Sequence, residues 1–323
     1  MEPNDRKLRL AVVGCGAVAA IHHLPAISLC RSAEVAVLVD ADAGRARDLA
    51  ARFGVAETAT DHRSLAGRVD AAIVAVPNSL HAPVTIELLR QGLHVLVEKP
   101  MAVTVPECDA MIAAAEAARA VLAVGLEFRF FDFSLLVRNL LRDGLLGKIR
   151  RFEMHLGVIP RWPFATDFLL RKETAGGGVL ADLGVHVLDL LLWWLGDWAD
   201  VEYRDDAQGG LESDCELLLA CRSGETGAVR GTVEISRTHS LSNTCFFEGE
   251  RASLRWGSGT RTRRSACCSR TARSSSPAAP GVRGARGSAS AMRSCARSRI
   301  SRRPSASAAS PSCPAARGAG SRP

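Results

Sequence analysis

Residues 261–323 contain no Asp, Glu, Lys, Leu or aromatic residue. Their 14 Arg give this segment a charge of +14, whereas 27 Lys and Arg against 34 Asp and Glu leave residues 1–260 at −7. The net charge of +7 for the whole chain therefore describes only its C-terminal segment. Because residues 1–260 carry excess negative charge, we expect no nucleic-acid partner for them.

CxxC pairs are absent from residues 1–260, and no apolar signal-like region precedes the first short apolar run at the N-terminus. These absences speak against a disulfide framework and against secretion, so we expect a reducing, cytoplasmic environment. Groups of His, Cys, Asp and Glu with metal-ligand spacing are also missing, and we expect no metal site.

One strongly apolar segment, residues 179–195, has 17 residues and includes three ionisable side chains. That length is at the short end for crossing a bilayer, and three ionisable groups would lie in the hydrocarbon. We therefore expect a buried helix and no membrane partner.

Short apolar runs alternate with helix-like segments through the first 125 residues. Strands are expected at 8–14, 34–40, 70–77, 94–100 and 121–127. Strands this apolar have no face for water, so the alternation predicts a parallel, doubly wound α/β sheet covered by helices on both sides. We assign residues 1–127 to this Rossmann-type domain.

A different pattern follows in residues 128–258. We expect a helix at 133–142, a strand at 148–158, the apolar helix within 176–196, and an antiparallel meander from 216 to 256. Glycine-containing turns separate the segments of the meander. The pattern predicts an α+β second domain with an open antiparallel or mixed sheet.

The first strand is followed by GCGAVA (14–19), which opens a helix. The first Gly permits a tight turn, the second allows a pyrophosphate close to the backbone, and the helix N-terminus faces the phosphates. An acid ends the second strand, where it can bond a ribose 2′-hydroxyl, and no Arg follows it directly, which favours NAD over the alternative NADP. A plain Gly-rich turn is the other interpretation. The expected cofactor contacts here are Gly14, Gly16, Ala17, Val18 and Asp40.

The apolar helix carries Asp182, His186 and Asp189 at i, i+4 and i+7, and therefore on one face. An Asp one turn before a His orients the imidazole and stabilises its protonated form, which suits a general acid/base. The three glycines at 176–178 let a ligand approach the positive end of the helix. The alternative is a satisfied polar pair in a core or interface. Asp189 has no assigned role.

Five motifs taken together resemble the Gfo/Idh/MocA family, named after glucose–fructose oxidoreductase and inositol dehydrogenase. They are GCGAVA (14–19), VPNSLH (76–81), EKP (98–100), GLEFRF (125–130) and GGGVLADLGVHVLD (176–189), and the resemblance spans residues 8–256. It implies a Rossmann domain followed by a domain whose open sheet binds substrate on one side and pairs subunits on the other. Its catalytic residues correspond to Lys99, Asp182 and His186.

The remaining site residues are expected from these motifs and from the segment before the glycines. Relatives often have Asn or Arg at the substrate-contacting position after the fifth strand, where this chain has Glu127 and Arg129. Further expected cofactor contacts are Pro77, Asn78, His81, Glu98 and Lys99, with Asn78 alternatively capping the next helix. Expected substrate contacts are Arg129, Arg161, Trp162 and Asp167.

The predicted function is that of an NAD(P)-dependent oxidoreductase moving hydride between a nicotinamide and a ring hydroxyl or ketone of a sugar, sugar derivative or cyclitol. In this interpretation His186, oriented by Asp182, transfers the hydroxyl proton, and Lys99 hydrogen-bonds the reacting oxygen. Two alternatives stay open: a non-catalytic NAD or sugar sensor, and an NAD-dependent glycoside-cleaving enzyme with transient oxidation. A homodimer or tetramer is expected if the second domain is intact.

Residues 259–323 are rich in Arg, Ser, Ala and Pro and show no periodicity, so we expect disorder. A basic RNA- or membrane-binding arm is one alternative. The composition favours a reading-frame error in a GC-rich gene, because residues 296–314, translated in a shifted frame with suitable codons, resemble the family's C-terminal helix. In that case the second domain lacks its last strands and has an exposed edge after residue 256.

Overall fold

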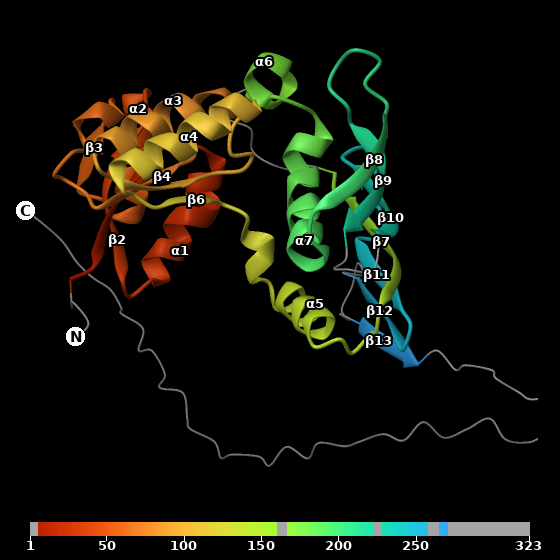
Figure 1. The fold of residues 1–323 in the computed structure, drawn as a ribbon. Coiled ribbons are helices and arrows are strands. Elements are labelled where there is room, and N and C mark those ends of the chain that lie inside the picture. Colours follow the sequence, from red (N-terminus) through yellow and green to blue (C-terminus); the bar gives the residue numbers. More distant parts are fainter. Residues whose placement is uncertain (1–5, 160–166, 223–227, 258–264, 271–323) are drawn as a thin grey trace, which may run out of the picture. The chain divides into compact units, whose positions relative to one another are not determined.

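The computed structural model describes residues 6–159, 167–222, 228–257 and 265–270 (Figure 1). Two sheets organise these residues, one parallel and one mixed. The predicted fold class, a doubly wound α/β domain followed by an α+β domain with an open sheet, is confirmed.

The parallel sheet has six strands in the order β3-β2-β1-β4-β5-β6. The order reverses between β1 and β4, the switch point at which ligands bind in open α/β sheets. Strand β4 is buried along its whole length, as its unbroken apolar run predicts. The short strand β3 is not among the expected strands. The bounds are β1 Leu8–Val13, β2 Ala33–Val39, β3 Glu57–Ala59, β4 Ala71–Val74, β5 His94–Val97 and β6 Leu122–Val124.

Helices connect these strands. The first begins with a π-helical segment, Ala19–His23, and continues as α1, Leu24–Leu29. The others are α2 (Ala43–Phe53), α3 (His81–Arg90) and α4 (Val105–Ala118). The Asp42 side chain caps α2 by accepting from two backbone amides, and Thr104 with Glu107 forms a capping box on α4.

The second sheet has seven strands in the order β13-β12-β11-β7-β10-β9-β8. Its central pair, β10 and β7, is parallel, so of the expected antiparallel or mixed sheets the mixed one is present. The pairs β9–β10 and β11–β12 are antiparallel as expected, but β7 lies between β10 and β11 and interrupts the expected meander. A long connection through the apolar helix separates β7 from β10 along the chain, and such a connection permits parallel pairing. The bounds are β7 Ile149–Gly157, β8 Trp198–Asp205, β9 Asp214–Arg222, β10 Ala228–Ser236, β11 Thr244–Gly249, β12 Ala252–Gly257 and β13 Ser265–Arg270.

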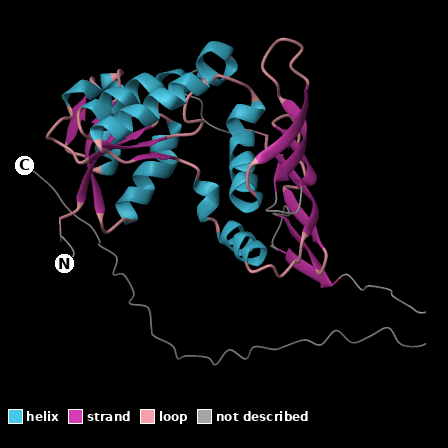
Figure 2. Cartoon of the chain, in the orientation of Figure 1, coloured by secondary structure: helices cyan, strands magenta, loops and turns pink. Residues whose placement is uncertain are grey.

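Helices α5 (Asp132–Arg142) and α7 (Val185–Leu195) lie on one face of this sheet, and the other face carries no described helix (Figures 1 and 2). The core between α7 and the sheet includes Leu190, Leu191 and Phe247, each at most 1% exposed. A short helix, α6 (Lys172–Ala175), precedes α7. The stretch Lys172–Leu195 is long and apolar enough to cross a membrane, a test that buried core helices also pass, and 56% of its most apolar window is buried.

Strand β13 lies in the segment expected to be disordered, and it pairs along the whole of β12. The expectation of disorder is therefore wrong for Ser265–Arg270, as is the expected unpaired edge after residue 256. Backbone groups along an open strand pair with any extended segment, because this pairing needs no apolar side chain. The rest of the expected tail lies outside the described residues.

Candidate active site

The Gly-rich turn has the geometry that dinucleotide binding requires. Gly14 has a φ of +99°, and a Cβ at this position would lie 2.3 Å from the carbonyl oxygen of Ala75. A Cβ on Gly16 would meet no atom within 4 Å, so the backbone there is open at the start of the first helix. Ala17 and Val18 form the first turn of that helix. The turn therefore fits the phosphates of a dinucleotide.

Asp40 fixes this turn through its carboxylate. Its Oδ2 accepts a hydrogen bond from the amide of Cys15 at 2.8 Å, and its Oδ1 accepts one from the amide of Asp42 at 2.9 Å. Arg45, on the first turn of α2, also contacts both oxygens, at 3.3 and 3.4 Å. No Arg directly follows Asp40, but this guanidinium, five residues further along the chain, reaches the carboxylate across the first turn of α2.

His81, which follows β4, is hydrogen-bonded to backbone oxygens of the protein itself. His81 is buried, with Nδ1 2.7 Å from the carbonyl oxygen of Pro100 and Nε2 2.9 Å from that of Val76. Burial lowers the pKa of His81, so the ring is neutral and donates to one of these oxygens. The ring thereby joins this loop to the loop after β5.

Asn78 reaches the second domain. Its Nδ2 donates to the carbonyl oxygen of Ala175, at the end of α6, at 2.9 Å. The expected capping role is wrong: the next short helical turn has Pro77 at its N-cap position and no side-chain cap. Sequence spacing misses this partner because it lies 97 residues away in the chain.

Glu98 lies at the end of β5 and pairs with the first helix. His23 Nε2 and Glu98 Oε1 are 2.7 Å apart, and both side chains are less than a fifth exposed. Burial raises the pKa of Glu98, but the hydrogen bond and charge of His23 outweigh it, and the net shift is downward. His23 therefore neighbours the Lys99 segment.

Lys99 meets the apolar helix. Its Nζ donates to Oδ1 of Asp182 at 2.7 Å and to the backbone oxygen of the same residue at 2.9 Å. On the other side of that carboxylate, Oδ2 lies 3.6 Å from Nη2 of Arg237, which directly follows β10. Nε and Nη2 of Arg237 are buried without a hydrogen-bond partner among the described residues. The expected Lys99–Asp182 neighbourhood is present, whereas no motif indicated Arg237.

Asp182 does not orient His186. No hydrogen bond joins the two, and Nδ1 of the buried imidazole has no hydrogen-bond partner among the described residues. Asp182 lies in a π-helical turn, Leu180–Gly184, whose wider spacing removes the side-by-side placement that i, i+4 residues have in an α-helix. The expected Asp182–His186 pair is therefore wrong, although both residues belong to the site.

His186 instead contacts the turn Glu127–Phe130. The Phe128 ring stacks on the imidazole with centroids 4.3 Å apart and an interplanar angle of 15°. Glu127 Oε2 lies 3.8 Å from His186 Nδ1. Burial, and then the charge of Lys99, lowers the pKa of His186 to about 4 despite nearby acids. The imidazole is therefore neutral near pH 7: the charge of Asp182 raises the pKa, as expected, but burial outweighs it.

A carboxylate already occupies the N-terminus of the apolar helix. Both oxygens of Glu212 accept from the amide of Gly178 at 3.0 Å, and Oε1 also accepts from Leu180. A Cβ on Gly178 would lie 2.0 Å from the Glu212 backbone oxygen. Gly178 therefore makes room for this internal cap, and the expectation of a ligand at the helix end is wrong here.

The expected substrate residues lie in different places. Arg129 donates to both oxygens of the buried Asp189, at 2.7 and 2.5 Å, which gives Asp189 a partner. Asp167 pairs with Arg171 on the surface. Arg161 and Trp162 lie outside the described residues.

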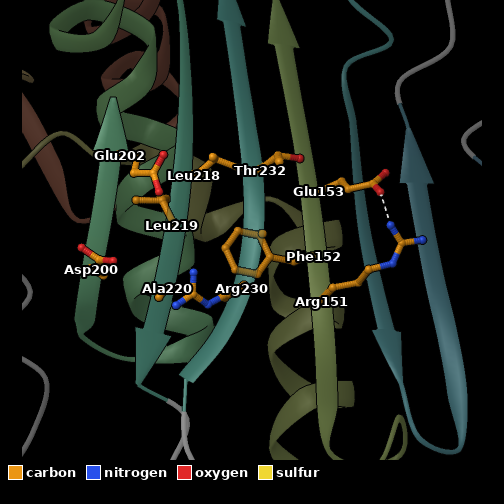
Figure 3. Close-up of a pocket in the computed structure, with 11 residues that line it drawn as sticks. Arg151, Phe152, Glu153, Asp200, Glu202, Leu218, Leu219, Ala220, Arg230 and Thr232 are labelled. Carbon is orange, nitrogen blue, oxygen red and sulfur yellow. Dashed lines mark hydrogen bonds and ion pairs between the residues drawn. The ribbon is translucent and has the colours of Figure 1, made fainter. Parts of the chain in front are cut away.

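Neither a metal-binding group of side chains nor the surface pocket drawn in Figure 3 coincides with this site. No group of three or more His, Cys, Asp or Glu suited to a metal is found in the described part of the chain. A surface pocket lies across strands β7 to β10, bordered by Arg151, Glu202 and Arg230 (Figure 3). None of its lining residues belongs to the Lys99–Asp182–His186 group.

The chain has a Gly-rich turn at the switch point of its parallel sheet, and a lysine and a histidine where this sheet meets the domain with the open sheet. These features define a class of two-domain, dinucleotide-dependent oxidoreductases. Residues 8–126 match the family model described as "Oxidoreductase family, NAD-binding Rossmann fold", and residues 134–255 match the "GFO/IDH/MocA C-terminal domain". The chain belongs to the Gfo/Idh/MocA family.

Similar proteins include sugar oxidoreductases. A putative UDP-kanosamine synthase oxidoreductase subunit from Amycolatopsis mediterranei is 36% identical over 70% of this chain and 63% of its own length. The D-glucoside 3-dehydrogenase of Escherichia coli is 33% identical over 58% of this chain and 54% of its own. The chain thus spans somewhat over half of these relatives.

Among solved structures, the WlbA dehydrogenase from Chromobacterium violaceum, in complex with NADH and UDP-GlcNAcA, matches with a TM-score of 0.71 and 25% identity. The match covers 79% of this chain and 75% of that one. It places the two-sheet arrangement within a fold that has been solved with a nicotinamide cofactor.

Proposed function

We propose that this chain is an NAD-dependent oxidoreductase acting on a ring hydroxyl or ketone of a sugar, sugar derivative or cyclitol. The proposal is supported chiefly by one contact: Lys99 Nζ donates a hydrogen bond to Asp182 Oδ1 at 2.7 Å, and Asp182 lies about one helical turn before the buried His186. This meeting joins the carboxyl edge of the parallel sheet to the helix on the open sheet. The relatives are named for the same substrate class.

The residues present fit NAD. Gly14 permits the tight turn, Gly16 leaves the backbone open to the pyrophosphate, and Asp40 lies at the end of β2, where a carboxylate can accept from ribose hydroxyls. When bound, NAD supplies a hydride acceptor or donor at its nicotinamide. Arg45, beside Asp40, partly neutralises this acid, and NADP is the alternative cofactor.

The side chains divide the proton chemistry between them. His186 is neutral because burial lowers its pKa to about 4, so in the oxidative direction it accepts the proton of the substrate hydroxyl. The Lys99 ammonium is oriented by Oδ1 and the backbone oxygen of Asp182. It donates a hydrogen bond to the substrate oxygen while the negative charge on that oxygen changes during the reaction. Asp182 holds the lysine and does not hold the histidine.

The full chain tests this proposal in two steps. NAD binding is measured by calorimetry, and NADH formation is followed with methyl glucosides, UDP-glucose and myo-inositol. His186→Ala and Lys99→Ala should each reduce turnover at least about 10²-fold while the Kd for NAD is unchanged. Lys172→Ala, an exposed lysine on α6, is the matched control and should retain parent activity.

Each outcome separates the candidates. Undiminished turnover in His186→Ala or Lys99→Ala contradicts the assignment of these residues. NAD binding with no sugar oxidised favours a sensor, and release of sugar from a glycoside without net NADH favours the glycoside-cleaving alternative.

We also propose that the chain is cytoplasmic and forms a homodimer or tetramer through the open face of the second sheet. No described helix covers this face (Figure 1). Light scattering of the purified full chain should give a dimer or tetramer mass, and a monomer mass at micromolar concentration would contradict this.

A further inference from the structure

Asp189 is a buried carboxylate for which the proposed chemistry has no use. Its side chain is only 9% exposed, and both of its oxygens accept from Arg129, through Nε at 2.7 Å and Nη2 at 2.5 Å. Such a two-bond arrangement fixes direction as well as distance, because the guanidinium and the carboxylate must be nearly coplanar. The pair therefore joins the turn Glu127–Phe130 to α7 in one orientation.

The same short turn supplies the groups that contact His186. Phe128, one residue before Arg129, stacks on the imidazole at 4.3 Å, and Glu127, two residues before it, reaches 3.8 Å from Nδ1. His186 itself lies one turn before Asp189 on α7. Nδ1 has no hydrogen-bond partner in the described part of the chain, so neighbouring rings and charges set the orientation of the imidazole.

We propose that the Arg129–Asp189 ion pair is a positioning device for His186, which acts by holding Phe128 and Glu127 against the imidazole. Arg129 and Asp189 are therefore positioning residues and not substrate contacts. The expected effect on turnover rests on the proposed function, whereas the expected effect on the position of the His186 ring does not.

The decisive variants are Arg129→Lys, which keeps the charge but loses the two-bond fork, and Asp189→Asn, which keeps the shape but loses the charge. Arg138→Lys is the matched control. Arg138 also lies over the Trp193 ring, at 4.3 Å against 5.5 Å for Arg129, so the control makes the same Arg-to-Lys change over the same ring without touching the pair with Asp189.

Two measurements on the full chain report the ring position and the turnover. Histidine-labelled protein gives the NMR signals of the His186 ring, assigned by their loss in His186→Asn. The stacked Phe128 ring displaces these signals, so both decisive variants should move them toward those of an unstacked histidine. The kcat for NADH formation should fall by about 10- to 100-fold with the Kd for NAD unchanged, and Arg138→Lys should leave signals and kcat within twofold of the parent.

Parent-like His186 signals and kcat in Arg129→Lys would overturn the proposal, as would an equal loss in Arg138→Lys. If the single variants fail to fold, the double variant Arg129→Gln with Asp189→Asn carries the test, because it leaves no uncompensated buried charge. Retained stacking signals in the double variant would also overturn the proposal. If the parent oxidises no sugar, the proposed function fails, yet the NMR comparison still decides whether the pair positions His186.

Discussion

Protonation of His186 should destabilise the folded chain in a defined pH range. Burial, and then the charge of Lys99, lowers its pKa from 6.5 to about 4, while Asp182, Glu98 and Asp189 act in the opposite direction. Because the pKa is lower in the folded state, the unfolded chain binds more protons below pH 6.5. The stability that the neutral imidazole contributes is complete above pH 6.5 and is lost as the pH falls toward 4.

The size of the effect follows from this difference in pKa. One pKa unit corresponds to about 1.4 kcal/mol, so a fall from pH 7 to pH 5 costs about 2 kcal/mol through this one group, and a fall to pH 4 costs about 3 kcal/mol. The His186 side chain is only 5% exposed, so screening by solvent reduces these values little.

Urea unfolding of the full chain, followed by tryptophan fluorescence, measures the effect. The free energy of unfolding is determined at pH 7 and pH 5 for the parent and for His186→Gln. Other titrating groups, including the buried His81, are present in both proteins and cancel in the difference. The parent should lose about 2 kcal/mol more than the variant. Parallel losses, with equal m-values, would refute the burial argument for His186.

Two further changes test the helix cap and the Gly-rich turn. Glu212→Ala removes the acceptor of the Gly178 amide and should lower the free energy of unfolding by about 2 kcal/mol. Glu216 is an exposed acid on β9, and the control Glu216→Ala should change this free energy by less than about 0.5 kcal/mol. Equal losses in the two variants would contradict the capping role. Gly14→Ala places a Cβ 2.3 Å from the Ala75 oxygen at a φ of +99° and should abolish NAD binding in calorimetry; parent-like affinity would show that the turn adapts.

The sequence predicts most of the parallel sheet because its strands are buried and therefore continuously apolar. Strand β4 is buried at all four positions. Strand β8, Trp198–Asp205, is exposed at most positions, so no continuous apolar run marks it. Its one strand signal is the alternation of Val201 and Tyr203 with charged residues. Strand β3 has only three residues, too few to show a period.

The residues of the candidate site are more predictable than their partners. Lys99 and Asp182 meet as the motifs imply, because both lie at the ends of elements whose placement the fold fixes. The partner of His186 cannot be predicted from spacing, since a π-helical turn changes the helix period exactly where the i, i+4 rule is applied. Arg237 belongs to no motif, and only the pairing of β10 brings it 3.6 Å from Asp182.

These partners determine the charge state of the proposed site near pH 7. Asp182 is an anion between two cations, Lys99 at 2.7 Å and Arg237 at 3.6 Å, and its charge raises the pKa of His186 less than burial and the charge of Lys99 lower it. His186 is therefore a neutral base at pH 7, the form that accepts a hydroxyl proton during oxidation. In the reverse reaction an imidazolium would be scarce. The Lys99 ammonium hydrogen-bonds the reacting oxygen in both directions of the proposed reaction, so Lys99→Ala should lower kcat/KM for oxidation and for reduction by the same factor.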